Sequence, residues 1–462
     1  MSSGRAAVVG AGVGGLTAAY RLTQAGFAVT VFESEPKPGG RVETLRAGGY
    51  VIDTAATAVG GGYADYRTLA AEVGVEIVPS PACTGIVRDG RIHLLRLDRM
   101  IRSGVTTGLL STTSKLRAAR LGFDVMRAKS KGLLDYSDMG KAAPLDTESA
   151  HDYAMRALNA ELDSYLCEPI TRAMLIADTC RASKVELFSG VANAFGGGWG
   201  ALEGGAIAIV DALVERVDRV RVSCAVSRAR SIGGGVEVVY SEPSGTERSE
   251  TFDVCVVACP LPAAVAICPG HQDVLGPLNE GLPFTSAITV AVGTTVRPAC
   301  PALMVQLPAR EERDIGLIFL DHNKTAGRAP DGHGLFTTDW EMDASARRFD
   351  EPDETLVAHA VTVLTKLFPE IAGTVDFTHV RRWPLALPHT KTGTFAKISA
   401  FNAGLDPADP IQFVGDWLSE AGQNSAMAVG NRAAANIVAH RSRSAAERPV
   451  DLIDAPHQDR HR

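Results

Sequence analysis

Short apolar runs at the start of the chain alternate with a glycine-rich turn and one helical pattern. Residues 5–9 (RAAVV) predict a strand, and GAGVGG follows directly. The next segment, LTAAYRLTQAG, carries apolar residues at helical spacing and ends at Gly26. A second apolar run, FAVTVFE, predicts another strand. This order predicts a βαβ unit with tight connections.

Further along the chain the patterns alternate between helix and strand. Helices are predicted over 147–180, over AIAIVDALVERV after Gly204 and Gly205, and over 353–368. Short strands are predicted at 220–230, 235–240 and 252–258, and more strands and loops at 284–340. Near the end, IQFVGDW predicts a strand and AMAVGNRAAANIVAH a helix, with a charged tail after 442 that we expect to be disordered.

One segment, 88–131, differs in charge from the rest. It holds eleven Lys or Arg residues against three acidic ones, a local net charge of +8, and its apolar residues interleave with the bases at roughly helical spacing. Three interpretations stay open: a solvated helical face, a peripheral contact with an anionic membrane, or attraction of a carboxylated substrate.

Composition narrows the protein class. The 462 residues are 45% hydrophobic with a net charge of −7, which is typical of a globular protein of two or three domains and argues against nucleic-acid binding. The eight cysteines contain no CxxC pair, so we expect no metal site and a reduced, cytoplasmic protein. We expect no signal peptide and no membrane span, because no run of about 20 apolar residues occurs.

The first candidate chemistry is the glycine pattern Gly10, Gly12, Gly15 followed by Glu33. The first glycine permits a tight turn, the second lets the backbone approach a pyrophosphate at a helix N-terminus, and the third lets helix and strand pack closely. A carboxylate at the end of the second strand accepts hydrogen bonds from the adenosine ribose hydroxyls. These features predict a dinucleotide site.

Two further motifs favour FAD over NAD. Gly40 and Arg41, in PGGR, place a guanidinium where it can pair with the pyrophosphate. At the other end of the chain, Gly415 and Asp416 follow a strand, and the carboxylate can hold a ribityl hydroxyl. The helix that begins near Asn424 to Met427 would point its N-terminus at the flavin N1–C2=O edge.

With these motifs in place, the chain resembles the flavin amine oxidase superfamily, which includes monoamine oxidases, protoporphyrinogen oxidases and phytoene desaturases. The segment VVGAGVGGLTAAYRLTQAGFAVTVFE, then PGGRVET and YVIDTAA, is similar to the N-terminal FAD signature. The segment IQFVGDWLSEAGQNSAMAVGNRAAA is similar to the C-terminal one. The stretch LEGGAIAIVDALVERV, with VSCAVSRARSI and FDVCVVACP after it, resembles the middle FAD segment, where Val226 matches a position whose backbone contacts adenine.

The resemblance favours one group of enzymes within the superfamily, and the sequence differs from the family pattern at two places. HNKTAGRAPDGHGLF and RRWPLALPHTKTG look more like protoporphyrinogen oxidases and desaturases than monoamine oxidases. Ala55 stands where the family commonly has glycine. The strand LPFTSAITVAV offers Thr285 and Ser286 but no lysine to match the one that many amine oxidases hold near flavin N5.

The resemblance and the motifs together predict an α/β fold with a Rossmann-type FAD-binding domain (ββα, glutathione-reductase-like) and an α+β substrate domain. The FAD-binding domain is expected from 1–87, 190–282 and 405–442, the substrate domain from 88–189 and 283–404, and a tail from 443–462. Non-covalent FAD is expected to contact the following residues: Gly10, Gly12, Gly14, Gly15, Glu33, Gly40, Arg41, Ala55, Ala56, Val226, Gly415, Asp416, Asn424, Ala426 and Met427.

No general base stands out, because a flavin that takes a hydride needs little beyond positioning. Tyr63, Trp199, Trp383 and His389 are candidates for the substrate site, against core packing for the aromatic residues and a backbone-bonded loop for the histidine. The predicted function is FAD-dependent oxidation or desaturation of a small-to-medium apolar substrate, with oxygen or another electron acceptor. The alternatives are a flavin amine oxidase, a redox-neutral flavin isomerase and a non-catalytic lipid-binding escort protein.

Overall fold

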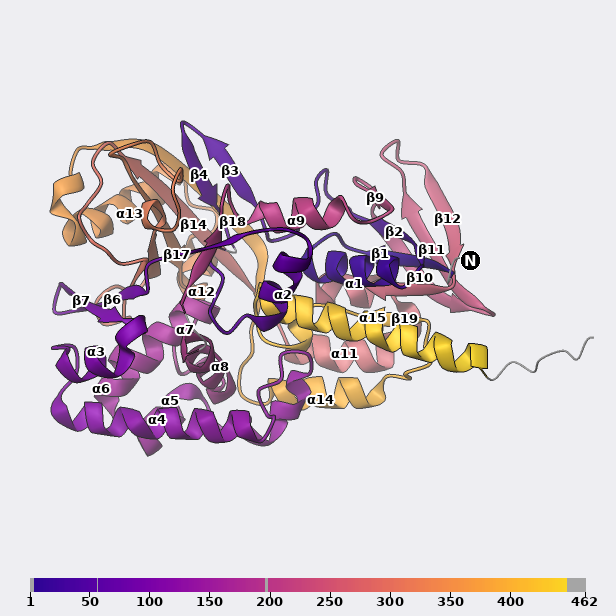
Figure 1. Ribbon diagram of the computed structural model, residues 1–462, viewed down its shortest axis with the longest axis horizontal. Helices are drawn as coiled ribbons and strands as arrows, with labels where there is room; N and C mark the ends of the chain where they lie inside the picture. The colour runs from indigo at the N-terminus through magenta and orange to yellow at the C-terminus, as the bar shows by residue number, and fades with distance from the viewer. Residues whose placement is uncertain (1–3, 56, 196–197, 447–462) are drawn as a thin grey trace, which may run out of the picture.

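The computed structural model describes residues 4–55, 57–195 and 198–446 (Figure 1). Strand β1 (Arg5–Val9), helix α1 (Val13–Gln24) and strand β2 (Ala28–Phe32) form the predicted βαβ unit, with the two strands parallel. Strands β9 (Arg219–Arg221), β13 (Val254–Val257) and β19 (Ile411–Phe413) complete a parallel sheet in the order β19-β13-β1-β2-β9. Most residues of these strands are buried, as expected for a parallel sheet covered on both faces.

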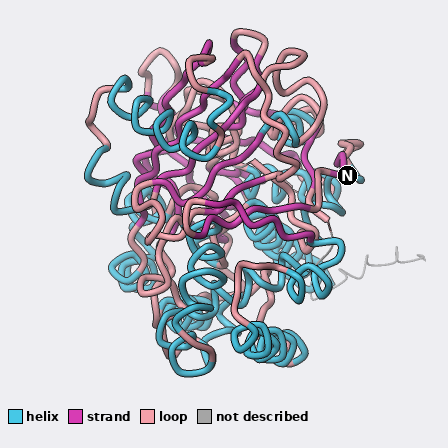
Figure 2. Tube along the Cα trace, turned by 90° about the vertical axis from the view of Figure 1, so that its left-hand side faces the viewer, coloured by secondary structure: helices cyan, strands magenta, loops and turns pink. Residues whose placement is uncertain are grey.

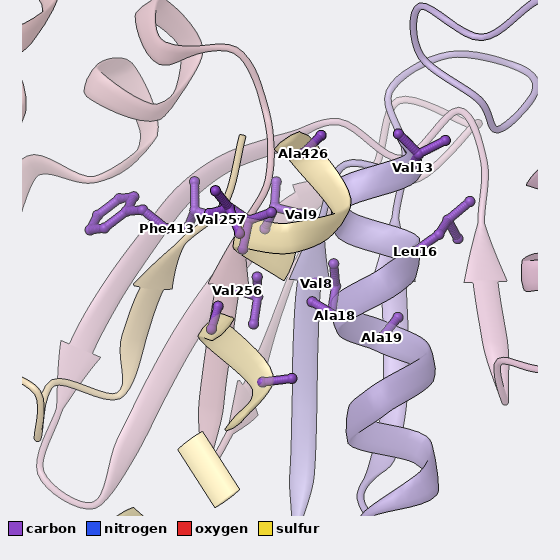
Figure 3. Close-up of a cluster of buried hydrophobic side chains, with 14 of the residues drawn as sticks. Val8, Val9, Val13, Leu16, Ala18, Ala19, Val256, Val257, Phe413 and Ala426 are labelled. Atoms are coloured by element: carbon purple, nitrogen blue, oxygen red, sulfur yellow. The ribbon is translucent and has the colours of Figure 1, made fainter. Parts of the chain in front are cut away.

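The turn from β1 into α1 depends on two glycines. Gly10 has a φ of +104°, a conformation in which a side chain is strained. A Cβ atom on Gly15 would lie 2.1 Å from the carbonyl oxygen of Gly10, so α1 packs closer to β1 than any side chain allows. Figure 3 shows the result: Val9 of β1 lies next to the first turn of α1, and Ala426 lies above them. Ala426 belongs to helix α15 (Gln423–Ala446), whose start packs on Gly14.

A seven-stranded sheet forms the second unit, in the order β18-β14-β17-β16-β15-β6-β7. Its neighbours are antiparallel except for the parallel pair β15 and β6. The strands are β6 (Cys83–Arg88), β7 (Arg91–Arg96), β14 (Phe284–Thr294), β15 (Met304–Gln306), β16 (Ile315–Leu320), β17 (Gly334–Trp340) and β18 (Val375–Pro388). One face packs on α12 (Met342–Arg348) and α13 (Asp353–Leu367) around an apolar core.

A layer of helices lies below this sheet, as Figure 2 shows in cyan. It contains α3 (Met100–Thr106), α4 (Thr112–Ser130), α5 (Ala150–Ala157), α6 (Ala160–Leu162), α7 (Glu168–Leu175) and α8 (Lys184–Phe195). A single π-helical turn, Asp163–Cys167, links α6 and α7. Leu121, Val125 and Phe188 belong to the separate apolar core of this layer. Among the described residues, no helix combines the length and apolarity needed to cross a membrane.

The other elements connect these units. They are the hairpin β3 (Thr44–Ala47) and β4 (Tyr50–Asp53), α2 (Ala64–Glu72), β5 (Ile77–Pro79), β8 (Gly200–Leu202), α9 (Ile207–Val214), the antiparallel sheet β10 (Val226–Ile232), β11 (Gly235–Ser241) and β12 (Glu247–Phe252), and the helices α10 (Leu261–Ile267), α11 (Gln272–Gly281) and α14 (Thr394–Gly404).

Three sequence-based expectations differ from these elements. The strand predicted at 220–230 is two strands, β9 and β10, because Ser223 between them has a φ of +51°. The domain boundary expected at residue 87 falls inside β6, which pairs with β7 and β15 of the seven-stranded sheet. The helix before the tail continues to Ala446, beyond the expected limit of 442, and residues 447–462 lie outside the described residues.

A buried ion pair joins the two units. Arg328, on the loop before β17, donates from Nη1 to Oδ2 of Asp53 at 2.7 Å and from Nη2 to the carbonyl oxygen of Leu202 at 3.1 Å. Both charged side chains are at most 1% exposed. The other oxygen of Asp53 accepts hydrogen bonds from Thr44 Oγ1 and from the backbone N–H of Ala206. Three segments that are distant in sequence therefore meet at one carboxylate: the β3–β4 hairpin, the start of α9 and the loop before β17.

We expect Arg328→Met to destabilise the protein strongly. The change leaves Asp53 buried without its cation, a situation that costs about 3–5 kcal/mol in the free energy of unfolding. Arg297→Met, at an exposed arginine before β15, is the control and should stay within about 0.5 kcal/mol of wild type. Thermal and urea unfolding measure both. A midpoint for Arg328→Met equal to that of the control would show that the pair is not needed for stability.

Candidate active site

Four of the five strands of the parallel sheet end at one cavity. Residues directly after the carboxyl ends of β1, β2, β13 and β19 line it: Gly10, Glu33, Ala258 and Val414. Ligands of open α/β sheets bind at this edge. The cavity has a volume of about 960 Å³ and continues from there to the seven-stranded sheet.

The glycine-rich turn leaves space where a phosphate would lie. Gly10, Gly12, Gly14 and Gly40 line the cavity. A Cβ atom added to Gly12 would meet no atom within 4 Å, and no side chain caps the N-terminus of α1. The first backbone N–H groups of this helix are therefore available to an anion. Gly15 does not line the cavity; it serves the close packing of α1 on β1.

Glu33 is held in place before any ligand binds. Its side chain is buried, with 6% of the residue exposed. One carboxylate oxygen accepts the backbone N–H of Ala11 at 2.7 Å, and the other accepts the N–H of Glu35 at 2.9 Å. The second oxygen also accepts from Ser34 Oγ at 3.2 Å, so further acceptor capacity remains on the oxygen bonded to Ala11, because each oxygen has two lone pairs. A diol at this wall of the cavity could donate a further hydrogen bond to Glu33.

Arg41 and Asp416 form a two-pronged ion pair. Nη2 of Arg41 donates to Oδ1 of Asp416 at 2.8 Å, and Nη1 lies 2.8 Å from Oδ2. Nη1 also donates to the carbonyl oxygen of Ala386. The two motifs that the sequence places near opposite ends of the chain thus meet at one point of the cavity wall.

The remaining predicted cofactor residues divide into two groups. Ala55, Val226, Gly415 and Ala426 line the cavity. Asn424 and Met427 are buried behind it: Asn424 Oδ1 accepts the backbone N–H of Tyr66, and Met427 belongs to the core under the parallel sheet. Ala56 lies outside the described residues.

Three of the four candidate substrate residues reach the cavity: Tyr63, Trp199 and Trp383. Burial raises the pKa of Tyr63 well above its usual range, so its hydroxyl stays protonated. The indole N–H of Trp383 donates to the carbonyl oxygen of Thr54, and its ring stacks on the guanidinium of Arg381 at 4.0 Å. His389 does not line the cavity; Nε2 lies 3.0 Å from the carbonyl oxygen of Arg181, which is the backbone-bonded alternative.

The sequence analysis did not single out the polar groups on the seven-stranded sheet. Thr289, Gln306, Asp339 and Arg381 all line the cavity. A weak signal was present, because the mostly apolar strands β14 and β17 each contain a few polar residues, among them Thr289 and Asp339. The sequence alone does not show which strands are neighbours, so these residues could not be assigned to one site from it.

A family model described as flavin containing amine oxidoreductase matches residues 13–438. The chain belongs to this family. It is therefore an FAD-dependent oxidoreductase, and FAD is its cofactor. The residues present fit that cofactor: an open glycine turn at a helix N-terminus, a buried carboxylate at the end of β2, and a cavity that extends beyond both.

Several of the named relatives are porphyrinogen oxidases. Coproporphyrinogen III oxidase of Mycobacterium bovis is 26% identical over 472 residues, covering 93% of this chain and 96% of that protein. Protoporphyrinogen oxidase 2 of Arabidopsis thaliana is 30% identical over 182 residues, covering 38% of this chain and 34% of that protein. Cyclohexylamine oxidase from Brevibacterium oxydans has the same fold, with a TM-score of 0.75 and 19% identity over 95% of this chain and 99% of that one.

We expect Glu33→Ala to weaken FAD binding by about 10- to 150-fold, because a hydrogen bond from a hydroxyl to a carboxylate contributes about 1.5–3 kcal/mol. Glu76→Ala is the control, since Glu76 is an exposed carboxylate that does not line the cavity. Fluorescence titration of apoprotein with FAD gives both affinities. If Glu33→Ala binds FAD within twofold of wild type, Glu33 does not hold the ribose.

Proposed function

We propose that this enzyme oxidises or desaturates a small-to-medium, mostly apolar substrate by transferring a hydride from a substrate C–H bond to FAD. The observation that carries this proposal is the apolar far end of the cavity. Its walls come from α7, β15 and β16: Ile170, Ala173, Met174, Met304, Leu317 and Phe319. Side chains of this kind exclude water and position a hydrocarbon.

In this proposal the chain holds non-covalent FAD with its two terminal motifs. The N-terminus of α1 and Arg41 would hold the pyrophosphate, Glu33 the ribose and Asp416 the ribityl chain. When bound, FAD accepts two electrons as a hydride and later passes them to oxygen or another acceptor. Tyr63, Trp199 and Trp383 would border the substrate at the domain junction.

The distribution of lysines supports C–H oxidation over amine oxidation. Lys37 is the only lysine among the described residues that line the cavity. It lies on the loop after β2, at the nucleotide end. Lys324 is fully buried behind the wall, with Nζ 4.3 Å from the centroid of the Phe319 ring and in contact with Asp321. Neither stands on β14, where the family resemblance would place the lysine of amine oxidases.

We expect simple primary amines to leave the flavin oxidised. Tyramine, benzylamine and putrescine at millimolar concentration are mixed anaerobically with the holoenzyme while the main flavin band is followed. A panel of alicyclic and terpenoid-like compounds is the positive arm, and bleaching there supports the proposal because such donors fit an apolar slot. Rapid bleaching by any of the amines would instead indicate an amine oxidase. Product formed without bleaching by either class would indicate an isomerase.

We further propose that helices α3 and α4 contact an anionic membrane surface peripherally, which would let an apolar substrate enter from lipid. Five large apolar side chains on these helices are more than 60% exposed: Ile101, Val105, Leu116, Phe123 and Met126. Leu116 and Phe123 share one face of α4 with Arg120 and Arg127, opposite the buried Leu121 and Val125. Apolar and basic residues on one exposed face are typical of helices that lie on anionic lipid.

We expect the protein to sediment with phosphatidylglycerol vesicles and much less with phosphatidylcholine vesicles. The double variant Leu116→Ser/Phe123→Ser should bind phosphatidylglycerol at least about ten-fold more weakly, because two apolar side chains are lost from the contact. Val296→Ser removes an exposed valine elsewhere and serves as the control. Equal binding of both variants and wild type, or no binding to either lipid, would exclude this contact.

A further inference from the structure

A row of side chains crosses the seven-stranded sheet on the face toward the cavity. In the strand register, Arg381 of β18 is opposite Thr289 of β14, and Thr289 is opposite Asp339 of β17. Asp339 is opposite Leu317 of β16, which is opposite Gln306 of β15. Directly opposed residues project from the same face of a sheet, and all five line the cavity.

Asp339 differs from the two carboxylates of the cavity wall that form ion pairs, and from Glu33, which is held by backbone N–H groups. Glu43 is paired with Lys37 and Arg381, and Asp416 with Arg41. Among the described residues Asp339 has no ion-pair partner within 4 Å. Its hydrogen bond from Thr289 Oγ1 is long, at 3.4 Å.

The charged groups around Asp339 are already paired with one another. Lys324 is in contact with Asp321 behind the wall, and Arg381 donates from Nε to Glu43 at 2.9 Å. Glu341, two residues further along the chain, bonds Nε of Arg172 at 2.7 Å.

A carboxylate in such surroundings is destabilised by desolvation and lacks a compensating cation. Burial raises the pKa of Asp339 to about 7; Asp321 adds to the increase, and Lys324 opposes it. The group is therefore ionised in part at neutral pH. A cation that enters the cavity would supply the partner that the protein does not.

We propose that Asp339 determines substrate specificity: it binds a protonated amine nitrogen carried on the otherwise apolar skeleton of the substrate. The ammonium group donates a charge-assisted hydrogen bond to the carboxylate, while the skeleton packs on Leu317, Phe319 and Met304. The nitrogen is thereby held at the sheet. It serves to bind the substrate and is separate from the C–H bond that is oxidised. This inference rests on the proposed function, since it assumes that the substrate occupies this end of the cavity.

The test compares two probes of nearly the same shape, benzylamine and benzyl alcohol, by calorimetric titration of the FAD-loaded enzyme at pH 8. We expect wild type to bind benzylamine at least about ten-fold more tightly than benzyl alcohol, as a charge-assisted bond implies. Asp339→Asn keeps the size of the side chain and should abolish the preference. Asp343→Asn removes a half-exposed carboxylate nearby and should leave it unchanged.

The pH dependence gives a second measurement on wild type alone. Below pH 7 Asp339 gains a proton and loses its charge, whereas a primary amine remains protonated up to pH 8. The Kd of benzylamine should therefore fall about ten-fold from pH 6 to pH 8. Burial also raises the pKa of Glu341 to about 7, so Asp339→Asn must make the profile flat if Asp339 is responsible.

Equal binding of the two probes by wild type, or a preference that survives in Asp339→Asn, would overturn the inference. So would a flat pH profile in wild type. These outcomes concern binding and are read without turnover. Failure of the proposed function has a different signature, because it appears as flavin reduction by simple amines or as no reduction by any C–H donor.

Discussion

The ion pair between Asp53 and Arg328 is the contact on which the rest of the site depends. A buried carboxylate is tolerated only with full compensation, and here the compensation comes from several directions. Arg328 belongs to the loop before β17, Thr44 to the first strand of the hairpin, and Ala206 to the start of α9. The hairpin and α9 belong to the side of the nucleotide motifs, and Arg328 to the side of the seven-stranded sheet. Fixing these segments to one another fixes the two walls of the cavity.

The two walls then carry different chemistry. The parallel sheet contributes the ends of its strands, where backbone N–H groups, glycines and Glu33 converge, and this is the chemistry of phosphate and ribose. The seven-stranded sheet contributes its face, where side chains alternate, so a mainly apolar surface can carry a few polar groups at chosen points. The cofactor end is therefore set by backbone geometry, and the substrate end by side-chain identity.

This difference also explains what the sequence could predict. The βαβ unit, the turn at Gly10 and Gly12, and the family were accessible because local patterns determine them, and the fold and the FAD cofactor were confirmed. The pairing of Arg41 with Asp416 was not accessible, because it joins positions 375 residues apart. Asp339 was missed for the same reason. Its neighbours in the cavity come from other strands, and no local sequence pattern determines the order of the strands in the sheet. His389 and Met427 lie close to residues that line the cavity, but they do not line it themselves.

The meeting of Arg41 and Asp416 has a consequence for biosynthesis. β19 joins the parallel sheet beside β13, and the start of α15 packs on Gly14, so the nucleotide cleft gains its last wall only from segments about 400 residues after the glycine turn. A nascent polypeptide that has already emerged with its glycine turn and Glu33 still lacks the floor against which the cofactor rests. FAD loading therefore has to wait until β19 and the start of α15 have folded against the N-terminal motifs, which makes it a late event in the folding of the chain.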